Sequence, residues 1–270
     1  MDRAKRLWKQ TFTVIRSNPV LLLPFLITTL FHAVALYILY CSPQRPVSIV
    51  LAPVVRAFFG DRFLHYPYNL FLLPELFRYG QILVEMFIGV FMTATLVAML
   101  DEINSGERLS FPIALVRSGR RYPALIVTWI IIFGITKGAW EFMTKFAPQA
   151  ENFFGVLVTV FSFFVYIVLQ ILFIYLVPLI IIKREKLVVA LKNNFKVVKK
   201  LFFSTLPLAV IPSVFYLPII VARLKLLFFV KAFEPEVVIV ILAVGIFVTF
   251  LVNLVITIST TLLFLENELE

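Results

Sequence analysis

The chain has 270 residues, of which 61% are hydrophobic and 15% are charged, and its mean hydropathy is +1.01. Soluble domains are about half apolar and about a quarter charged, so this composition excludes a water-soluble globular fold. The net charge of +10 is compatible with nucleic acid or with anionic lipid as a partner. Because the Lys and Arg residues flank apolar segments, membrane lipid is favoured and nucleic acid is not expected.

Three basic stretches, at residues 3–16, 108–121 and 183–200, each lead into a long apolar segment, and a second apolar segment follows each of these. A membrane-spanning helix needs about 20 residues. The repetition therefore predicts an all-α, polytopic transmembrane helix bundle with six spans in three helix pairs, forming one integral membrane domain over residues 1–270. The spans are expected at about 19–40, 81–100, 123–140, 153–182, 201–221 and 237–264.

The first basic stretch has the pattern of an amphipathic helix that lies in the headgroup region of a membrane. Leu7 and Phe12 can face lipid, while three cations face water and the headgroups: Lys5, Lys9 and Arg16. The segment between the first two spans, residues 41–80, is unusually apolar for a loop and contains several prolines. A lid over the bundle and a plain interfacial helix are both compatible with its sequence.

The second and third basic stretches repeat the amphipathic pattern. Their expected headgroup-binding cations are Arg117, Arg120, Arg121, Lys192, Lys196, Lys199 and Lys200. Two interpretations stay open: these cations bind anionic lipid, or they only orient the chain in the membrane. By either interpretation, 16 of the 25 Lys and Arg residues fall on one side of the six-span arrangement, together with both termini. Positive residues mark the cytoplasmic side, so both termini are expected in the cytoplasm.

Polar or small residues recur on one face of each even-numbered span. The key members are Glu85 in the second span, Gln170 in the fourth and Asn253 in the sixth. Hydrocarbon cannot satisfy polar groups, so these faces are expected inside the bundle, where they either pack spans 2, 4 and 6 together or line a path for a solute. Glu85 is expected about four residues into its span, near the outer headgroups. His32, the only histidine in a span, is expected to be a hydrogen-bonded packing residue.

Motifs that carry catalysis are absent from the sequence. It contains no H-E-x-x-H, no G-x-S-x-G and no glycine-rich phosphate loop. With two histidines and three aspartates in the whole chain, the sequence predicts no enzyme activity, no cofactor and no metal site.

Two segments carry a resemblance to known proteins. They contain Trp8, Phe12, Ile15, Arg16, Ser17, Asn18 and Pro19 in the first copy, and Pro178, Ala190, Leu191, Lys192 and Asn194 in the third. The pattern resembles prokaryotic six-span membrane proteins of unknown function that are related to the membrane domain of anchored glycerophosphodiester phosphodiesterases. The resemblance implies the plasma membrane of a prokaryote. The phosphodiesterase barrel is not in this sequence, so the resemblance implies no catalysis.

The sequence therefore predicts a non-catalytic, multi-pass plasma-membrane protein. Its basic cytoplasmic helices are expected to engage anionic lipid, a protein partner or a second copy of the chain. The alternative is a transporter of a small solute or a lipid, with a polar path between spans 2, 4 and 6.

Overall fold

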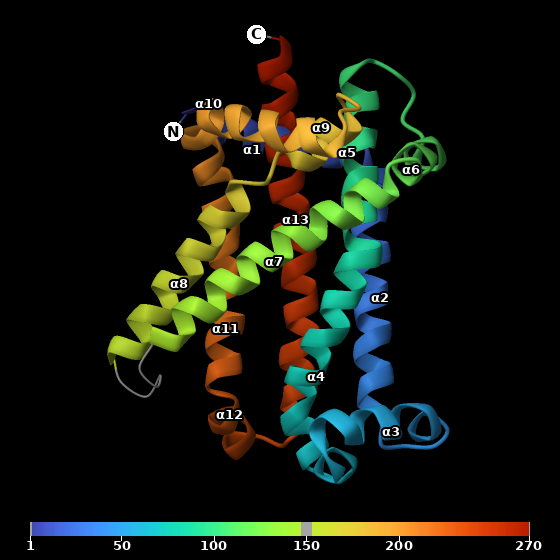
Figure 1. Ribbon diagram of the computed structural model, residues 1–270, viewed down its shortest axis with the longest axis vertical. Helices are drawn as coiled ribbons and strands as arrows, with labels where there is room; N and C mark the ends of the chain where they lie inside the picture. Colours follow the sequence, from blue (N-terminus) through green and yellow to red (C-terminus); the bar gives the residue numbers. More distant parts are fainter. Residues whose placement is uncertain (1, 147–152, 270) are drawn as a thin grey trace. The chain divides into compact units, whose positions relative to one another are not determined.

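The computed structural model describes residues 2–146 and 153–269, which form helices and connecting turns with no β-strand (Figure 1). Among these residues, six helical segments are long and apolar enough to cross a membrane. They are Pro19–Tyr40, Tyr68–Asn104, Tyr122–Ala139, Phe161–Ile181, Leu187–Leu224 and Val237–Glu268. The prediction of an all-α, six-span bundle is confirmed, and the protein is a multi-pass membrane protein.

The second span begins earlier than the predicted residue 81. It consists of α4 (Tyr68–Val84), the π-helix η3 (Glu85–Gly89) and α5 (Val90–Asn104). The expected start is wrong because Pro74 lies inside α4 and does not end it. A proline removes one backbone N–H, and membrane helices tolerate this when neighbouring groups satisfy the freed carbonyl.

The fifth span also begins earlier than expected. The third basic stretch and the span after it form one continuous helix, α10 (Leu187–Ser213), which is followed by η4 (Val214–Tyr216) and α11 (Leu217–Leu224). The predicted boundary at residue 201 does not exist, because no glycine or proline separates the lysines from the apolar residues. Pro207 and Pro212 lie inside α10.

The fourth span is interrupted, although one continuous helix over 153–182 was predicted. The helix α8 (Phe153–Ile171) ends in turns at 172–175, and the short helix α9 (Leu176–Ile181) follows. Pro178 explains the position of the break, because a proline ring collides with the carbonyl four residues earlier, here that of Ile174. Asn194 of α10 donates from Nδ2 to the freed Leu172 carbonyl at 2.6 Å.

The contacts divide the chain into two compact units, and the single-domain assignment stays a prediction. Unit 1 comprises Met1–Pro24, Gly89–Val214 and Asn253–Glu270. Its centre is α5, whose residues 94–100 are all buried, because α6 (Phe111–Gly119), α7 (Tyr122–Phe146) and α9 pack around it. The N-terminal helix α1 (Asp2–Ser17) packs on α10, and η1 (Pro19–Leu22) follows it.

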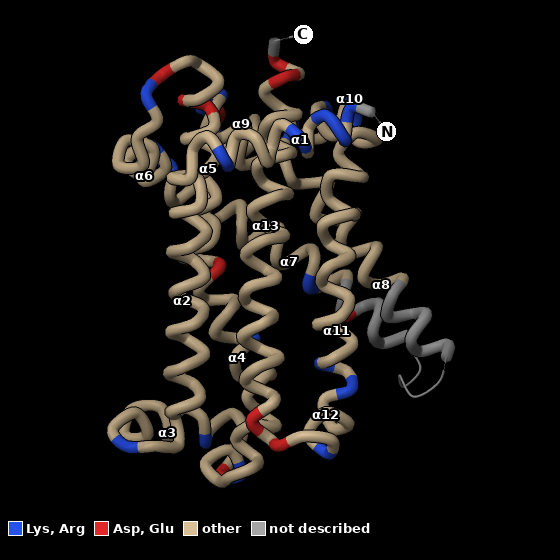
Figure 2. Tube along the Cα trace, turned by 180° about the vertical axis from the view of Figure 1, so that it is seen from behind, with Lys and Arg blue, Asp and Glu red and all other residues tan. Residues whose placement is uncertain are grey.

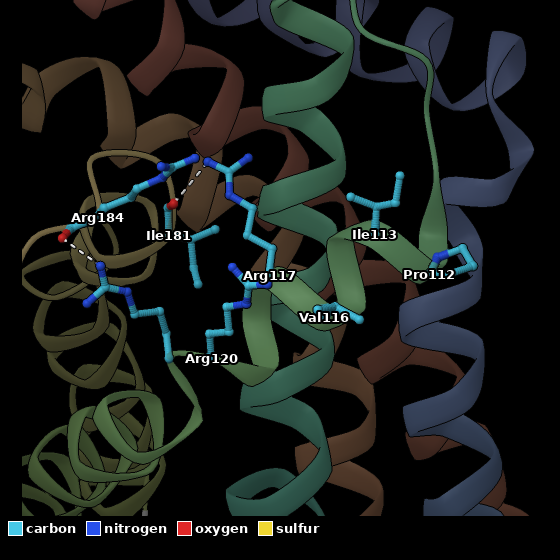
Figure 3. A pocket seen from close by; sticks show the side chains of 8 residues that line it. Pro112, Ile113, Val116, Arg117, Arg120, Ile181 and Arg184 are labelled. Atoms are coloured by element: carbon cyan, nitrogen blue, oxygen red, sulfur yellow. Dashed lines mark hydrogen bonds between the residues drawn. The ribbon is translucent and has the colours of Figure 1, made fainter.

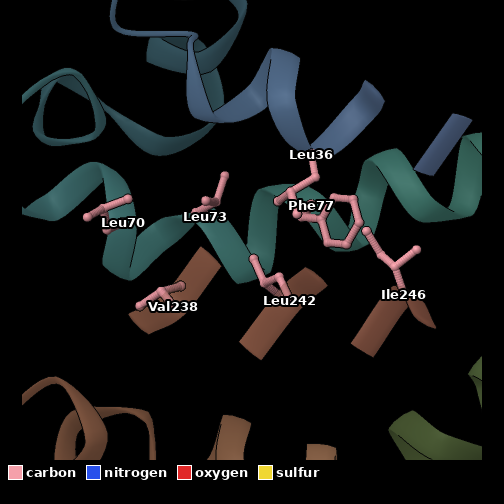
Figure 4. Packing of buried hydrophobic residues seen from close by; sticks show 7 residues of the cluster. All are labelled: Leu36, Leu70, Leu73, Phe77, Val238, Leu242 and Ile246. Carbon is pink, nitrogen blue, oxygen red and sulfur yellow. The ribbon is translucent and has the colours of Figure 1, made fainter. Parts of the chain in front are cut away.

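Unit 2 comprises Phe25–Ile88 and Phe215–Val252. It contains most of α2 (Leu23–Tyr40), then α3 (Val47–Phe59), η2 (Asp61–Leu64), α4, α11, α12 (Leu226–Ala232) and the first part of α13 (Val237–Leu269). Its core is an apolar cluster in which α2, α4 and α13 meet (Figure 4), made of Leu36, Leu70, Leu73, Phe77, Val238, Leu242 and Ile246.

The segment 41–80 proves to be helical over much of its length. The helix α3 exposes a run of large apolar side chains, among them Ile49, Val50 and Phe58. Exposed apolar residues on a short helix beside membrane spans are typical of an interfacial helix. The alternative of a lid stays a prediction.

Candidate anion-binding site

The cations of unit 1 gather around α1, α6 and α10, as Figure 2 shows. In α1, the buried face consists of Ala4, Leu7 and Thr11. The opposite face exposes the three predicted cations Lys5, Lys9 and Arg16. Leu7 does not face lipid as expected, because α1 packs this face on α10.

The helix α10 has the same two-sided character. Ala190, Asn194 and Val198 are buried on one face. The four predicted lysines lie on the opposite face and are exposed: Lys192, Lys196, Lys199 and Lys200. The first part of α10 is therefore amphipathic, with its cations directed away from the protein.

Other cations of the basic stretches are paired with carboxylates near the C-terminus. Arg3 and Arg6 both donate to Glu266, and Lys183 Nζ lies 2.7 Å from Glu268 Oε2. These contacts bring the two ends of the described chain together within unit 1 (Figure 1). None of these three paired cations belongs to the predicted lipid-binding set.

A cavity of about 610 Å³ lies between α6 and the turn that follows α9 (Figure 3). We call it the arginine pocket. Its lining residues are Pro112, Ile113, Val116, Arg117, Arg120, Arg121, Ile181 and Arg184. Four guanidinium groups and four apolar side chains thus line one cavity. This combination suits a ligand in which an anionic group adjoins an apolar part, because guanidinium groups bind phosphate and carboxylate oxygens with paired hydrogen bonds.

Two carboxylates at the end of α5 hold α6 in position. Glu102 Oε2 accepts a hydrogen bond from the backbone N–H of Ser110 at 2.9 Å, at the start of α6. Asp101 Oδ2 accepts from Arg117 Nη2 at 2.7 Å, and the same nitrogen donates to the Ile181 carbonyl at 3.1 Å. The Nε of Arg117 is buried and has no partner among the described residues, so this arginine is fixed in place and retains an unused donor.

Arg184 stands in the left-handed backbone region, with φ of 55°. It lies in the turn that follows α9, and the N–H of Glu185 bonds back to the Leu179 carbonyl at 3.2 Å. A side chain in this conformation costs about 1 to 3 kcal/mol. The side chain of Arg184 points toward Arg117 in Figure 3, and the Arg184 carbonyl accepts from Arg121 Nη2 at 3.0 Å.

The pocket brings together three of the predicted headgroup-binding residues, Arg117, Arg120 and Arg121, and adds Arg184, which was not predicted. The sequence shows Arg184 only as one of seven cations in the stretch 183–200. Its role depends on where α9 ends, and no glycine or proline marks that point.

Two predicted intramembrane candidates meet in unit 2. His32 of α2 and Glu85 at the start of η3 place Nε2 and Oε1 3.6 Å apart. Glu85 lies in the middle of its 37-residue segment, 17 residues after Tyr68, and not four residues into a span as expected. The difference follows from the earlier start of α4.

The other two candidates differ in exposure. Gln170 is exposed on α8, so the expectation that it faces the bundle interior is wrong. The reason is that α8 buries its apolar stripe of Phe163, Ile167 and Ile171, which turns Gln170 outward. Asn253 is half-buried on α13. Gly155 and Thr159, which belong to the predicted polar face of this span, have side chains outside the described residues.

No protein-family model matches the chain, and neither a curated protein nor a solved structure matches it. The fold and the composition therefore define the class, a multi-pass helical membrane protein, and the resemblance to the six-span prokaryotic proteins stays a prediction.

Proposed function

We propose that the protein is a non-catalytic membrane protein that binds anionic, phosphate-bearing lipid through the basic end of unit 1. The observation that carries this proposal is the arrangement of Arg117, Arg120, Arg121 and Arg184 around one cavity with an apolar wall. The positive-inside rule places this end on the cytoplasmic side, and we propose the plasma membrane of a prokaryote as its location.

Two kinds of contact act together in this proposal. The exposed lysines on α10 and the exposed cations on α1 attract an anionic membrane surface, at about 1 kcal/mol for each cation near the surface. The arginine pocket selects among the attracted lipids, because several guanidinium groups can hold one phosphate group in a fixed geometry. Ile113, Val116 and Ile181 provide an apolar wall for the adjoining part of the lipid.

The proposal is tested with the purified protein in nanodiscs that contain phosphatidylglycerol and phosphatidylcholine, by counting the retained lipids with native mass spectrometry. The double variant Arg120→Gln with Arg184→Gln should retain fewer phosphatidylglycerol molecules than the parent. The matched control is Lys137→Gln, which removes an exposed cation from α7 outside the pocket and should retain the parent's number.

Two outcomes separate the possible ligands. If added inorganic phosphate displaces phosphatidylglycerol from the parent but not from the double variant, the pocket recognises the phosphate group itself. If the parent retains phosphatidylglycerol when no phosphate is added, lipid is a source of that group. Equal retention of phosphatidylglycerol by the double variant and the parent would contradict the proposal.

A further inference from the structure

A histidine and a glutamate face each other within the membrane-spanning part of unit 2. The distance of 3.6 Å between His32 Nε2 and Glu85 Oε1 is too long for a hydrogen bond, but it is a close contact for ionisable groups in such a segment. The side chain of His32 is 3% exposed and that of Glu85 is 32% exposed. Ionisable residues inside membrane spans are rare, and they commonly mark ion or proton sites.

The hydrogen bonds of His32 determine which ring nitrogen faces the carboxyl group. His32 bonds to the backbone of Gln81, one turn before Glu85. Nε2 is buried and has no hydrogen-bond partner among the residues that the structure describes, so Nδ1 is the ring nitrogen available to donate to the Gln81 carbonyl. In a neutral imidazole only one nitrogen carries a proton, so Nε2 faces Glu85 as a bare acceptor. An ionised carboxylate opposite a bare nitrogen leaves two acceptors in contact with no hydrogen between them.

One added proton removes this conflict. With a single proton on either Nε2 or the carboxyl group, the pair is either an imidazolium beside a carboxylate or a neutral imidazole beside a carboxylic acid, and both forms have zero net charge. Without that proton, a lone negative charge stays in the membrane-spanning segment, and with a second proton a lone positive charge does. Both charged states are costly in hydrocarbon.

The backbone at Glu85 also departs from an ordinary α-helix. Glu85 is the first residue of the π-helix η3, and π-turns inside α-helices frequently occur at functional sites. The N–H of Glu85 bonds to the carbonyls of both Gln81 and Ile82. The carbonyl that fixes the His32 ring thus belongs to the junction of the α- and π-helical turns.

The surroundings in unit 2 supply little competing charge. On α4, Glu75 and Arg78 pair with each other at 3.9 Å and are exposed. Arg223 of α11 lies against α13. The tyrosines of α2, Tyr37 and Tyr40, line a separate cavity with α13.

We propose that His32 and Glu85 form a proton-binding pair that takes up one exchangeable proton in total, carried on either His32 Nε2 or Glu85 Oε1. Uptake of the proton from a hydronium ion forms one N–H or O–H bond on the pair, and release breaks that bond and returns the proton to water. This site does not depend on lipid binding by the arginine pocket.

Nuclear magnetic resonance of ¹⁵N-labelled histidine tests the proposal directly, because the chain has only two histidines. The variant His65→Gln leaves His32 as the single labelled ring in the full-length protein in nanodiscs. The ¹⁵N signals should show a protonated Nδ1 and an Nε2 that gains a proton as the pH is lowered. Infrared spectroscopy follows the Glu85 carboxyl band, which is identified by its loss in Glu85→Gln. The Nε2 signal and this band should change over the same pH range, because two groups that compete for one proton titrate as a pair.

Three variants in the His65→Gln protein make the test specific. Glu85→Gln should change the Nε2 signal, whereas the matched control Glu75→Gln, on the same helix, should not. His32→Gln should change the Glu85 carboxyl band, and it gives a second reading of the contact if Glu85→Gln does not fold. An Nε2 signal unaffected by Glu85→Gln, a bare Nδ1 with a protonated Nε2, or a carboxyl band unaffected by His32→Gln would overturn the proposal.

Discussion

Arg184 occupies a backbone conformation that favours glycine, and its side chain supplies one of the four guanidinium groups of the arginine pocket. A glycine at this position would relieve the strain of the left-handed conformation. The pocket would then lose a cation. Stability therefore favours glycine at this position, whereas the proposed binding of anionic lipid favours arginine.

We expect Arg184→Gly to make the protein more stable and to weaken its binding of anionic lipid. The gain in the free energy of unfolding should be up to about 2 kcal/mol, because relief of about 1 to 3 kcal/mol of backbone strain is offset by about 0.4 to 1 kcal/mol for the added freedom of glycine in the unfolded chain. Thermal unfolding and native mass spectrometry measure the two effects. Arg184→Lys is the control, since it keeps the charge and the strain and should leave stability unchanged. A variant Arg184→Gly that binds lipid as well as the parent would remove Arg184 from the site.

Residue types alone identified part of the pocket. Arg117, Arg120 and Arg121 were predicted to bind headgroups because they lie together in a basic stretch before an apolar span. Their individual roles could not be predicted, because Arg117 depends on Asp101 and on the Ile181 carbonyl, which is 64 residues away in the sequence. Arg184 could not be distinguished from its basic neighbours, since its place in the pocket depends on its left-handed backbone conformation, which the sequence does not indicate.

At the scale of helices, the existence of the six spans followed from hydropathy, but their ends did not. Pro74 and Pro207 lie inside continuous helices, whereas Pro178 follows an interruption. The residue type is the same in all three cases. At the break before Pro178, the side chain of Asn194 donates a hydrogen bond to the Leu172 carbonyl. Asn194 lies 22 residues after Leu172 in the chain, so the sequence around Pro178 does not indicate this hydrogen bond.

The interruption before α9 therefore depends on Asn194, and we expect Asn194→Leu to destabilise the protein. The substitution would leave the Leu172 carbonyl without its donor at a partly buried position, which costs about 1 kcal/mol in the free energy of unfolding. Chemical unfolding in detergent measures the change. Lys196→Leu is the control on the exposed face of the same helix and should change stability by less than about 0.5 kcal/mol. Equal stability of Asn194→Leu and the parent would show that the break does not need this bond.

At the scale of the whole molecule, the charges divide between an exposed set and a set paired within the protein. The exposed set on α10 is available to the headgroups of the membrane surface. We therefore expect the replacement of four lysines by glutamine to weaken the binding of anionic lipid by about 1 kcal/mol for each lysine. The four are Lys192, Lys196, Lys199 and Lys200. Lipid retention at low salt measures the loss, and the difference from the parent should shrink at high salt because screening weakens exposed charges.

A control with the same loss of charge separates position from net charge. It replaces four exposed cations of unit 2 by glutamine: Arg45, Arg62, Lys225 and Lys231. This variant should retain anionic lipid as the parent does. If both quadruple variants lost the same amount of retained lipid, the lysines of α10 would act only through the net charge of the protein. If the α10 variant retained as much lipid as the parent, these lysines would act only as topology signals.

Topology decides which membrane leaflet the arginine pocket can reach. The excess of Lys and Arg on one side predicts that α1, α6 and the first part of α10 are cytoplasmic. In a Cys41→Ser background, which removes the only cysteine of the chain, a cysteine at Lys196 should resist a membrane-impermeant thiol reagent added to intact cells. A cysteine at Tyr66, which is exposed in the segment between the first two spans, should react. Both positions should react once the membrane is permeabilised, which shows that each thiol is accessible. Labelling of the Lys196→Cys variant from outside intact cells would reverse the orientation and would place the pocket against the outer leaflet.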